Sequence, residues 1–580
     1  MPADPRLALA LKYQHAGLTD AAWAALRELV AEADADEDAL RLGLALRTAA
    51  AAWADVAELN RRLLARRPDD GALWCAQGDA LERLGRPLEA IAAYERAAAL
   101  APTLAAAHVN LGGALIGQGR FAAAAATLHR ALALAPDNAA ALVNLGVAEV
   151  ERGAVAQGQA CFRRALALAP GNRDAADNLL FSHHNISDDP ADLLALHRRL
   201  APLWPARRAV PVRNPAPARR WRIGYVSPDF RRHSVAFFVE PLLRHHDRAA
   251  VAVVCYADVA APDEVTARFR ALADVWRDVH GCSDAALAEQ IAADGIDVLV
   301  DLAGHTQGNR LGVFAAGAAP VQLTALGYPG TTGLAAFDGR LCDALTDPPG
   351  SEAASAEPLV RIPGGMHCYR PPAEAPAVEP LPCAANGVVT FGSFNKLAKI
   401  SPATVALWAA VLAAVPGARL LVKAKPLAEA ETRQQLAARF AAAGVAPGRL
   451  ELLGWAPDDR GHLDLYNRVD IALDTFPYNG TTTTCEALWM GVPVLTLAGR
   501  THAARVGVGL LHSLGASAWV ADSPRRFVDT AVRLAADAAA LAEVRAGLRA
   551  RMAASRLCDG PAYARAVETA YAAIIGVRAG

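Results

Sequence analysis

The stretch DTFPYNGTTTTCEALWMG, residues 474–491, joins the end of a buried strand to the start of a helix. The segment Val469–Leu473 before it predicts a short strand, and a proline, an asparagine and a glycine then break the chain. Four threonines, Thr481 to Thr484, follow where the helix begins. A helix start leaves backbone N–H groups unpaired and attracts anions, and threonine hydroxyls add donors. A well-capped helix of any α/β domain would look the same, so the rest of the chain decides between the two interpretations.

Bulk composition narrows the classes of function. The 580 residues suffice for about three or four domains, and 58 basic against 59 acidic residues give a net charge of −1, which indicates no affinity for nucleic acid. No apolar run reaches the length of a membrane helix, and the first residues lack a secretion signal. The nine cysteines stand singly, which favours a reducing compartment and no structural metal. We therefore expect a cytoplasmic protein without a membrane partner.

A repeat of 34 residues organises the first third of the chain. Prolines recur at this interval from Pro68 to Pro170, and two series of glycines, starting at Gly78 and Gly85, keep the same interval. This is the tetratricopeptide period, in which each repeat is a pair of antiparallel helices with small residues where the helices touch. We predict tetratricopeptide repeats over residues 68–185. Residues 1–67 have the same helical texture without the markers and predict degenerate or capping repeats.

Three asparagines, Asn110, Asn144 and Asn178, also recur every 34 residues. An asparagine amide has both a donor and an acceptor, so a row of them on one face of a solenoid can hold an extended polypeptide. The alternative is a structural hydrogen bond between neighbouring repeats. We favour peptide binding, because repeat solenoids present extended concave surfaces. The repeats could also pair two chains into an oligomer.

The second part of the chain alternates strands with helices. Prolines and arginines mark residues 186–220 as a linker or docking segment. Residues 221–375 and 386–558 each predict a doubly wound α/β domain, with a cleft between the two, and residues 559–580 predict a closing helix.

Several polar residues in the first α/β half follow predicted strands, where open α/β sheets place their ligands. His233 lies in SPDFRRHS and is either a base, a substrate donor or a loop histidine. His305 follows the next strand in DLAGHT, and Asp294 either serves the site or ends a helix. The glycine- and proline-stiffened loop LGYPGTTG, residues 326–333, can bring its backbone close to a sugar.

In the second half, FGSFNKLAKIS places Lys396 and Lys399 in a loop after a strand. A lysine at this position can neutralise the charge on a departing diphosphate. On its own, either side chain would be read as a solvated surface lysine. His462, in GWAPDDRGHLDLY, can stack on a nucleobase.

Taken together, the phrases GYVSPDF with its histidine, DLAGHT, LGYPGTTG, FGSFNKLAKI and DTFPYNGTTTTCEALWMG, after a tetratricopeptide array, resemble the intracellular protein O-glycosyltransferases. That family includes the O-GlcNAc transferases and the plant SPINDLY-type O-fucosyltransferases. The resemblance covers nearly the whole chain. It implies an α-solenoid followed by a GT-B catalytic region of two Rossmann-like domains. It also implies inverting transfer from a nucleotide sugar to serine or threonine of proteins, without metal or other cofactor.

The same resemblance implies roles for single residues. His233 corresponds to the active-site histidine near sugar and acceptor, and Lys399 to the lysine that stabilises the leaving diphosphate. The implied contacts of the nucleotide sugar are Lys396, Ala456, His462, Thr482, Thr483 and Glu486, with Leu326, Gly327 and Pro329 in the loop that borders the sugar.

Two positions depart from the animal O-GlcNAc transferases, which carry histidine where Asp297 and Thr481 stand here. GHT, FGSFN and GTTTTCE are closer to the fucosyltransferase branch. The resemblance thus predicts transfer of N-acetylglucosamine from UDP-GlcNAc, with GDP-fucose as the alternative donor. A repeat scaffold that binds nucleotide sugar without transferring it is the alternative from another class, and the general base stays open between His233 and a donor phosphate oxygen.

Overall fold

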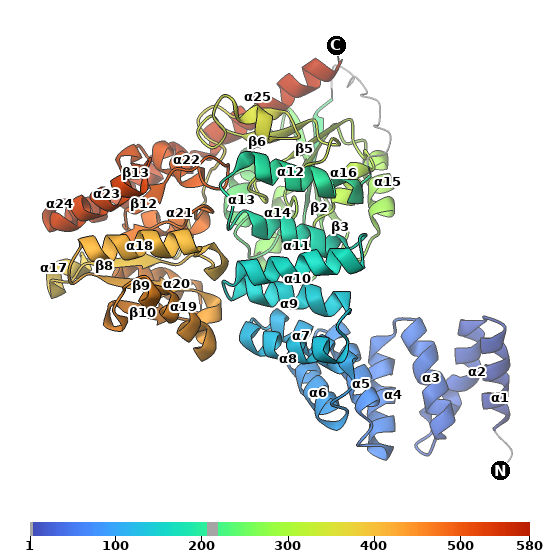
Figure 1. The fold of residues 1–580 in the computed structure, drawn as a ribbon. Helices are drawn as coiled ribbons and strands as arrows, with labels where there is room; N and C mark the ends of the chain where they lie inside the picture. The colour runs from blue at the N-terminus through green and yellow to red at the C-terminus, as the bar shows by residue number, and fades with distance from the viewer. Residues whose placement is uncertain (1–3, 206–218, 457, 580) are drawn as a thin grey trace. The chain divides into compact units, whose positions relative to one another are not determined.

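The computed structural model describes residues 4–205, 219–456 and 458–579 (Figure 1). By their contacts the residues divide into two units. The first comprises the chain up to residue 149 together with residues 156–170, and the second comprises residues 150–155 and the chain from residue 171 onward.

The first unit is an array of antiparallel helix pairs. Glycines stand where the paired helices touch: a Cβ at Gly78 would lie 2.4 Å from the Tyr94 ring, and one at Gly112 would lie 2.5 Å from Leu128. The helices are α1 (Pro5–His15), α2 (Thr19–Ala31), α3 (Glu37–Ala49), α4 (Trp53–Arg66), α5 (Gly71–Arg83), α6 (Pro87–Leu100), α7 (Ala105–Gly117), α8 (Phe121–Leu134), α9 (Ala139–Glu151) and α10 (Val155–Leu168).

The second glycine series ends the first helix of a repeat. Gly85 and Gly119 have φ of +70° and +73°, a left-handed conformation that other residues rarely adopt. Asp70 begins α5, because its carboxylate accepts hydrogen bonds from the N–H groups of Ala72 and Leu73.

The second unit begins with α11 (Arg173–His183) and α12 (Pro190–Leu200). This differs from two predicted boundaries. The predicted repeat region reached residue 185, but α11 groups with the α/β domains because its side chains bind residues there, such as His305. The predicted linker 186–220 contains α12, which buries Leu193, Leu194 and Leu196. Asp189 caps this helix and Pro190 opens it, a start signal that the proline-rich composition of the segment concealed. Residues 206–218 of that linker lie outside the described residues.

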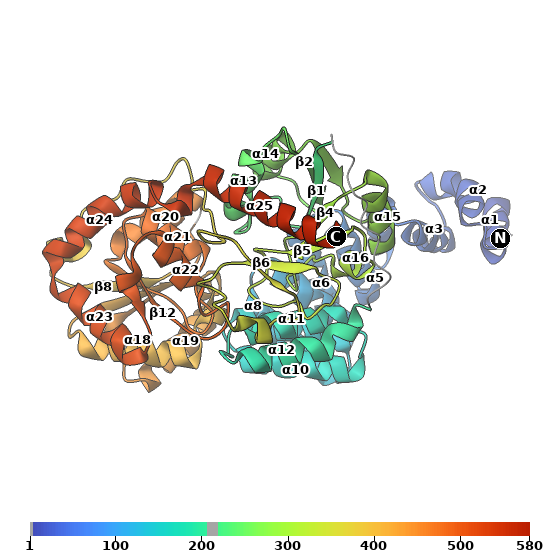
Figure 2. The same cartoon turned by 90° about the horizontal axis from the view of Figure 1, so that it is seen from above.

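Seven parallel strands form the sheet of the first α/β domain, in the order β3-β2-β1-β4-β5-β6-β7. Tyr563, Val567 and Tyr571 of α25 are buried in the core of this domain, and Figure 2 shows α25 lying beside α13. The closing helix therefore returns from the second domain to the first. The elements are β1 (Trp221–Ser227), α13 (Ala236–His245), β2 (Val251–Ala257), α14 (Glu264–Leu272), β3 (Val275–Asp278), α15 (Asp284–Asp294), β4 (Val298–Asp301), α16 (Leu311–Ala315), β5 (Val321–Thr324), β6 (Gly339–Cys342), β7 (Leu359–Arg361) and α25 (Gly560–Ala579).

Six parallel strands form the second sheet, in the order β10-β9-β8-β11-β12-β13. Its elements are α17 (Pro382–Asn386), β8 (Thr390–Ser393), α18 (Pro402–Ala414), β9 (Arg419–Lys423), α19 (Ala430–Ala442), β10 (Leu450–Leu453), α20 (Asp459–Asp464), β11 (Ile471–Leu473), α21 (Thr482–Trp489), β12 (Val494–Leu497), α22 (Val506–Ser513), β13 (Val520–Ala521), α23 (Pro524–Ala536) and α24 (Ala538–Ala553).

The predicted fold class, an array of helix pairs followed by two doubly wound α/β domains, is confirmed. In each sheet the strand order reverses at one place, between β1 and β4 in the first and between β8 and β11 in the second. Ligands of such sheets bind outside the carboxyl ends of the strands at this place. Within the described residues, no helix is both long and apolar enough to span a bilayer.

The glycines at the helix contacts generate a prediction for stability. We expect Gly112→Ala to destabilise the first unit by about 1–3 kcal/mol, because the added methyl overlaps the buried Leu128 side chain. Gly117→Ala in the same helix meets no atom within 4 Å and is the matched control, expected to be neutral or slightly stabilising. Hydrogen exchange of the α7 and α8 amides in the full chain measures both. If the α7 and α8 amides are equally protected from exchange in the two variants, the expected overlap with Leu128 is wrong.

Candidate functional site

The reversal point of the first sheet carries a histidine beside a buried carboxylate. After β1, the Ser227 hydroxyl accepts a hydrogen bond from the Asp229 N–H, and Asp229 Oδ2 lies 3.4 Å from His233 Nδ1. The Asp229 side chain is 7% exposed and that of His233 is 39% exposed. His233 Nδ1 accepts a hydrogen bond from the Val235 N–H at 3.3 Å and lies beside the Asp229 carboxylate, while the rest of the ring is open.

Electrostatics keep His233 neutral. Burial, together with the positive charges of Arg231 and Lys396, lowers its pKa to about 4. Burial raises the pKa of Asp229 to about 6 against the opposing charges of the same two residues. Beside these residues, Arg232 Nη1 of the first domain donates to Asp459 Oδ2 of the second at 2.5 Å, so the two domains face each other here. A neutral histidine can accept a proton or a hydrogen bond.

Lys399 is the cation at the reversal point of the second sheet. It ends the short 3₁₀ helix η3 (Leu397–Lys399), and its Nζ donates to the Asn479 carbonyl oxygen at 2.7 Å. The same Nζ lies 3.6 Å from the centre of the Tyr478 ring. Burial lowers the pKa of Lys399 to about 7, although Asp474 opposes this effect. The lysine is thus fixed in place and poorly solvated.

Helix α21 begins directly beside this lysine. Its N-cap residue Thr481 makes no side-chain capping hydrogen bond. The Thr483 hydroxyl donates to Asn395 Oδ1 at 2.8 Å and that of Thr484 donates to the Gly480 carbonyl oxygen at 3.0 Å, while Thr482 is half-buried in the first turn. An uncapped helix start has free N–H groups and partial positive charge, so an anion fits between it and Lys399.

A polar cluster lies on the β9 and β10 side of α21. His462 Nε2 lies 2.9 Å from Glu486 Oε2, and its other nitrogen contacts the ammonium of Lys423. The Tyr466 hydroxyl donates to the same Glu486 oxygen at 3.3 Å. Burial lowers the pKa of Lys423 to about 8. The structure therefore brings His462 and Glu486 together. Ala456 is buried, and its contact with the nucleotide sugar stays a prediction.

The backbone of the loop LGYPG, at the end of β5, adopts a conformation that restricts which residues fit. Leu326 has φ of +60°, and a Cβ at Gly327 would lie 1.9 Å from the Leu302 carbonyl oxygen, so only glycine fits. The Tyr328 hydroxyl reaches His184 and His197, which lie after α11 and on α12. Leu326 and Gly327 thus lie at the carboxyl edge of the first sheet, and Pro329 lines the cavity described below.

Two predicted candidates, His305 and Asp294, are engaged by other protein groups. His305 is buried, with Nδ1 2.6 Å from Asp177 and Nε2 2.8 Å from the Thr332 carbonyl oxygen, so neither nitrogen is left for a substrate. Asp294 ends α15 at the amino side of β4, where its carboxylate accepts hydrogen bonds from Tyr256 and Arg277. A role of either residue in binding substrate stays a prediction. The chain position of His305 after a strand did not reveal Asp177, which lies 128 residues away.

The three repeated asparagines differ in their surroundings. Asn110 donates to Asp79 at 2.7 Å within the first unit, which is the inter-repeat hydrogen bond of the alternative interpretation. Asn144 is half-buried on α9. Asn178 belongs to the second unit and donates to the Asp174 carbonyl oxygen of its own helix at 2.8 Å. Peptide binding by these residues remains a prediction.

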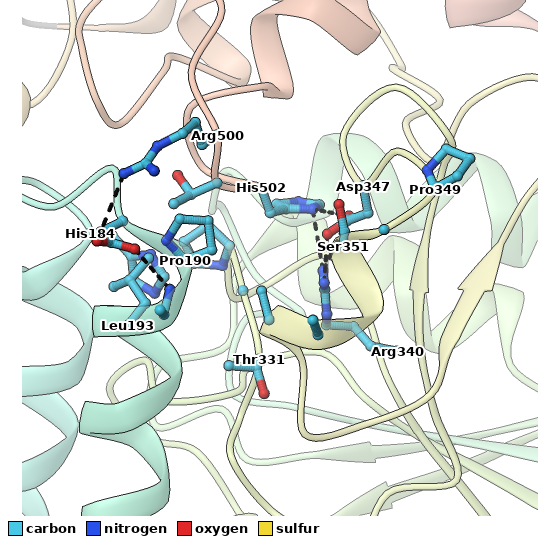
Figure 3. A pocket seen from close by; sticks show the side chains of 18 residues that line it. His184, Pro190, Leu193, Thr331, Arg340, Asp347, Pro349, Ser351, Arg500 and His502 are labelled. Carbon is cyan, nitrogen blue, oxygen red and sulfur yellow. Dashed lines mark hydrogen bonds and ion pairs between the residues drawn. The ribbon is translucent and has the colours of Figure 1, made fainter.

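A cavity of about 500 Å³ adjoins the LGYPG loop. Figure 3 shows Arg340 and Asp347 of the first domain meeting His502 of the second, with His184, just after α11, and Pro190 of α12 on the opposite side. Arg340 Nη2 and His502 Nδ1 lie 2.7 and 2.6 Å from the two carboxylate oxygens of Asp347. The cluster ties the two domains together across the cavity. No sequence signal indicated it, because its members lie up to 162 positions apart.

Burial acts to raise the pKa of Asp347, but the charges of His502 and Arg340 outweigh it and hold that pKa well below its usual range. Among the described residues, no group of three or more histidine, cysteine, aspartate or glutamate side chains is arranged to hold a metal ion.

Known proteins match both parts of the chain. The model of glycosyl transferase family 41 matches residues 205–367 and 381–567, and tetratricopeptide repeat models match residues 71–104 and 109–173. A solved structure of a Thermobaculum terrenum O-GlcNAc transferase mutant is 37% identical with a TM-score of 0.83, over 88% of this chain and 98% of that one. These matches confirm the resemblance predicted from the motifs and the GT-B-like fold.

Curated relatives match over the catalytic part. The Oryza sativa subsp. japonica protein "Probable UDP-N-acetylglucosamine–peptide N-acetylglucosaminyltransferase SPINDLY" is 46% identical over 353 residues, which are 60% of this chain and 38% of that protein. The Caenorhabditis elegans "UDP-N-acetylglucosamine–peptide N-acetylglucosaminyltransferase" is 26% identical over 469 residues, 60% of this chain and 40% of that protein. The chain therefore spans about two fifths of the length of these relatives.

The buried cluster generates a prediction about stability. We expect Asp347→Asn to destabilise the second unit by about 3–5 kcal/mol, because it leaves a buried arginine without its counter-charge. Since the folded-state pKa of Asp347 is depressed, its contribution is present at neutral pH and is lost as the pH falls through the acid range. Chemical unfolding at pH 7 measures the effect. Asp522→Asn, in an exposed ion pair with Arg526, is the control and should change little; equal effects would contradict the prediction.

Proposed function

The chain belongs to glycosyl transferase family 41, and from that membership we propose that it is an inverting protein O-glycosyltransferase. In this proposal it transfers N-acetylglucosamine from UDP-GlcNAc to serine or threonine hydroxyls of cytoplasmic polypeptides. The observation that carries the proposal is the pairing of Lys399 with the uncapped start of α21 at the carboxyl edge of the second sheet. A cation and a helix start at one place suit a group that gains negative charge during the reaction.

The proposed reaction is a single displacement. The acceptor oxygen forms a bond to the anomeric carbon from the face opposite the diphosphate, and the bond between that carbon and the phosphate oxygen breaks. The electron pair leaves with the nucleoside diphosphate, whose charge is taken up by Lys399, by the N–H groups of Thr482 and Thr483 and by the Thr482 hydroxyl. A protein cation would thereby do the work that a metal ion does elsewhere, so we expect transfer without added metal.

The acceptor hydroxyl must lose its proton during this step. His233 is neutral and half-exposed, so it is suited to accept that proton or to orient the hydroxyl. A phosphate oxygen of the donor is the alternative base. Glu486, held by His462 and Tyr466, is placed to bind a ribose hydroxyl, with the imidazole of His462 beside the base. The repeats would hold the acceptor polypeptide.

GDP-fucose is the second candidate donor. The observation that favours it is the set of phrases GHT, FGSFN and GTTTTCE, which are closer to the fucosyltransferase branch than to the animal O-GlcNAc transferases. The displacement and the role of Lys399 would be the same for either sugar.

Replacement of Lys399 tests transfer against binding alone. We expect Lys399→Ala to lower kcat by about 10²–10³-fold, because the leaving charge loses its counter-ion, while the donor still binds. Product formation on a peptide pool and donor binding by calorimetry measure the two effects. Lys12→Ala, which removes an exposed lysine in α1, is the control. Wild-type activity in Lys399→Ala would exclude the mechanism, and a wild-type chain that binds donor without transfer would favour the scaffold.

The lowered pKa of Lys399 predicts the pH dependence. In the free enzyme the lysine loses its proton as the pH rises through about 7, so kcat/KM for the donor should fall over that range. The bound diphosphate favours the charged lysine, so kcat should hold to higher pH. Lys399→Arg stays charged over the whole range and should lose this alkaline limb. If kcat/KM of Lys399→Arg falls over the same alkaline range, the fall belongs to the titration of another group.

A further inference from the structure

Lys399 is held by an aromatic ring where an ion pair would be the usual arrangement. Its ammonium lies 3.6 Å from the centre of the Tyr478 ring and gives one hydrogen to the Asn479 carbonyl oxygen. A ring attracts a cation through its quadrupole but carries no negative charge. The ring therefore leaves the charge of the protonated ammonium uncompensated, whereas a carboxylate partner would have compensated it, and the ammonium still has hydrogens to donate.

The Tyr478 ring is itself held from α11. Phe181 meets it edge-on, with ring centres 6.1 Å apart at 87°, and the His184 ring lies 6.3 Å away at 63°. Phe181 also contacts Tyr328 of the LGYPG loop, with ring centres 6.1 Å apart. One helix thus supports both the ring under Lys399 and the loop at the carboxyl edge of the first sheet.

A chain of hydrogen bonds fixes His184 in turn. His197 Nδ1 lies 2.6 Å from the Leu193 carbonyl oxygen, so this nitrogen carries the proton and Nε2 is an acceptor. The Tyr328 hydroxyl donates to that Nε2 at 2.7 Å, so its oxygen accepts from His184 Nε2 at 3.1 Å. The donor and acceptor of each hydrogen bond in this chain are therefore fixed. His184 Nε2 is the donor to Tyr328, and this bond orients the His184 ring beside Tyr478.

We propose that Tyr478 is a positioning residue whose ring, supported by Phe181 and His184, holds the ammonium of Lys399 toward the departing diphosphate. This inference rests on the proposed function of Lys399. Without the ring, the flexible lysine side chain loses the contact that sets its direction, and its ammonium loses an attraction that favours the charged form. The last helices before the α/β domains, α11 and α12, are then part of the catalytic machinery.

Two substitutions at residue 478 separate the ring from the hydroxyl. Tyr478→Phe keeps the ring and should retain kcat within about twofold. Tyr478→Leu keeps an apolar side chain but removes the ring, and we expect kcat to fall on the order of tenfold or more. Its alkaline limb should move to lower pH, because a ring favours the charged lysine; Asp474 and Lys396, the other charges that act on Lys399, are unchanged. Phe181→Leu should show a smaller effect in the same direction.

Phe440→Leu is the matched control, because Phe440 is fully buried in the same domain and stacks on Trp408. If Tyr478 has only a structural role, Tyr478→Leu should behave like Phe440→Leu: its thermal stability falls and its pH profile is unchanged. That result would overturn the proposal. Binding of UDP and GDP, measured across pH by calorimetry, gives a readout that needs no transfer. If the wild type transfers no sugar, the proposed function fails, while weaker nucleotide binding in Tyr478→Leu than in Tyr478→Phe still supports the positioning role.

Discussion

The buried carboxylate of Asp474 is the constraint on which the site depends. It is 2% exposed, and its oxygens accept hydrogen bonds from the N–H groups of Thr475 and Gly480 and from the Thr496 hydroxyl, at 2.7 to 2.8 Å. These bonds fold the chain between β11 and α21 into one shape, so the helix start, the Tyr478 ring and the Asn479 carbonyl oxygen all face Lys399. Burial raises the pKa of Asp474, and the nearby lysine opposes that rise. Asp474 thus sets both the conformation of the loop and part of the electrostatic potential at Lys399.

The second constraint is the attachment of α11 and α12 to the α/β domains. Asp177 binds His305 and Asn309, and His184 and His197 bind Tyr328. These are buried polar contacts, which are costly to break singly and therefore hold the loops at the carboxyl edge in one arrangement. The two helices that follow the repeats in sequence thus pack, in structure, against the loops of the first α/β domain.

The sequence predicts what is periodic or local. The 34-residue interval predicts the helix pairs and their glycine contacts, and motifs at strand ends predict which loops meet, since parallel strands end at one edge. Partners far apart in the chain are not predicted: helical texture assigned α11 to the repeats, and nothing local indicated that Asp177 would occupy His305. Tyr478 lies inside the most informative motif, yet its role depends on a lysine 79 positions earlier.

The most direct test of the account is sugar transfer from two separate donors. The purified chain is incubated with UDP-GlcNAc or with GDP-fucose, and mass added to the protein and to a peptide pool is followed by mass spectrometry. We expect N-acetylhexosamine on serine or threonine with UDP-GlcNAc and no addition with GDP-fucose. Addition of fucose alone would contradict UDP-GlcNAc as the donor. Binding of both nucleotide sugars without addition from either would contradict the proposal that the chain transfers a sugar.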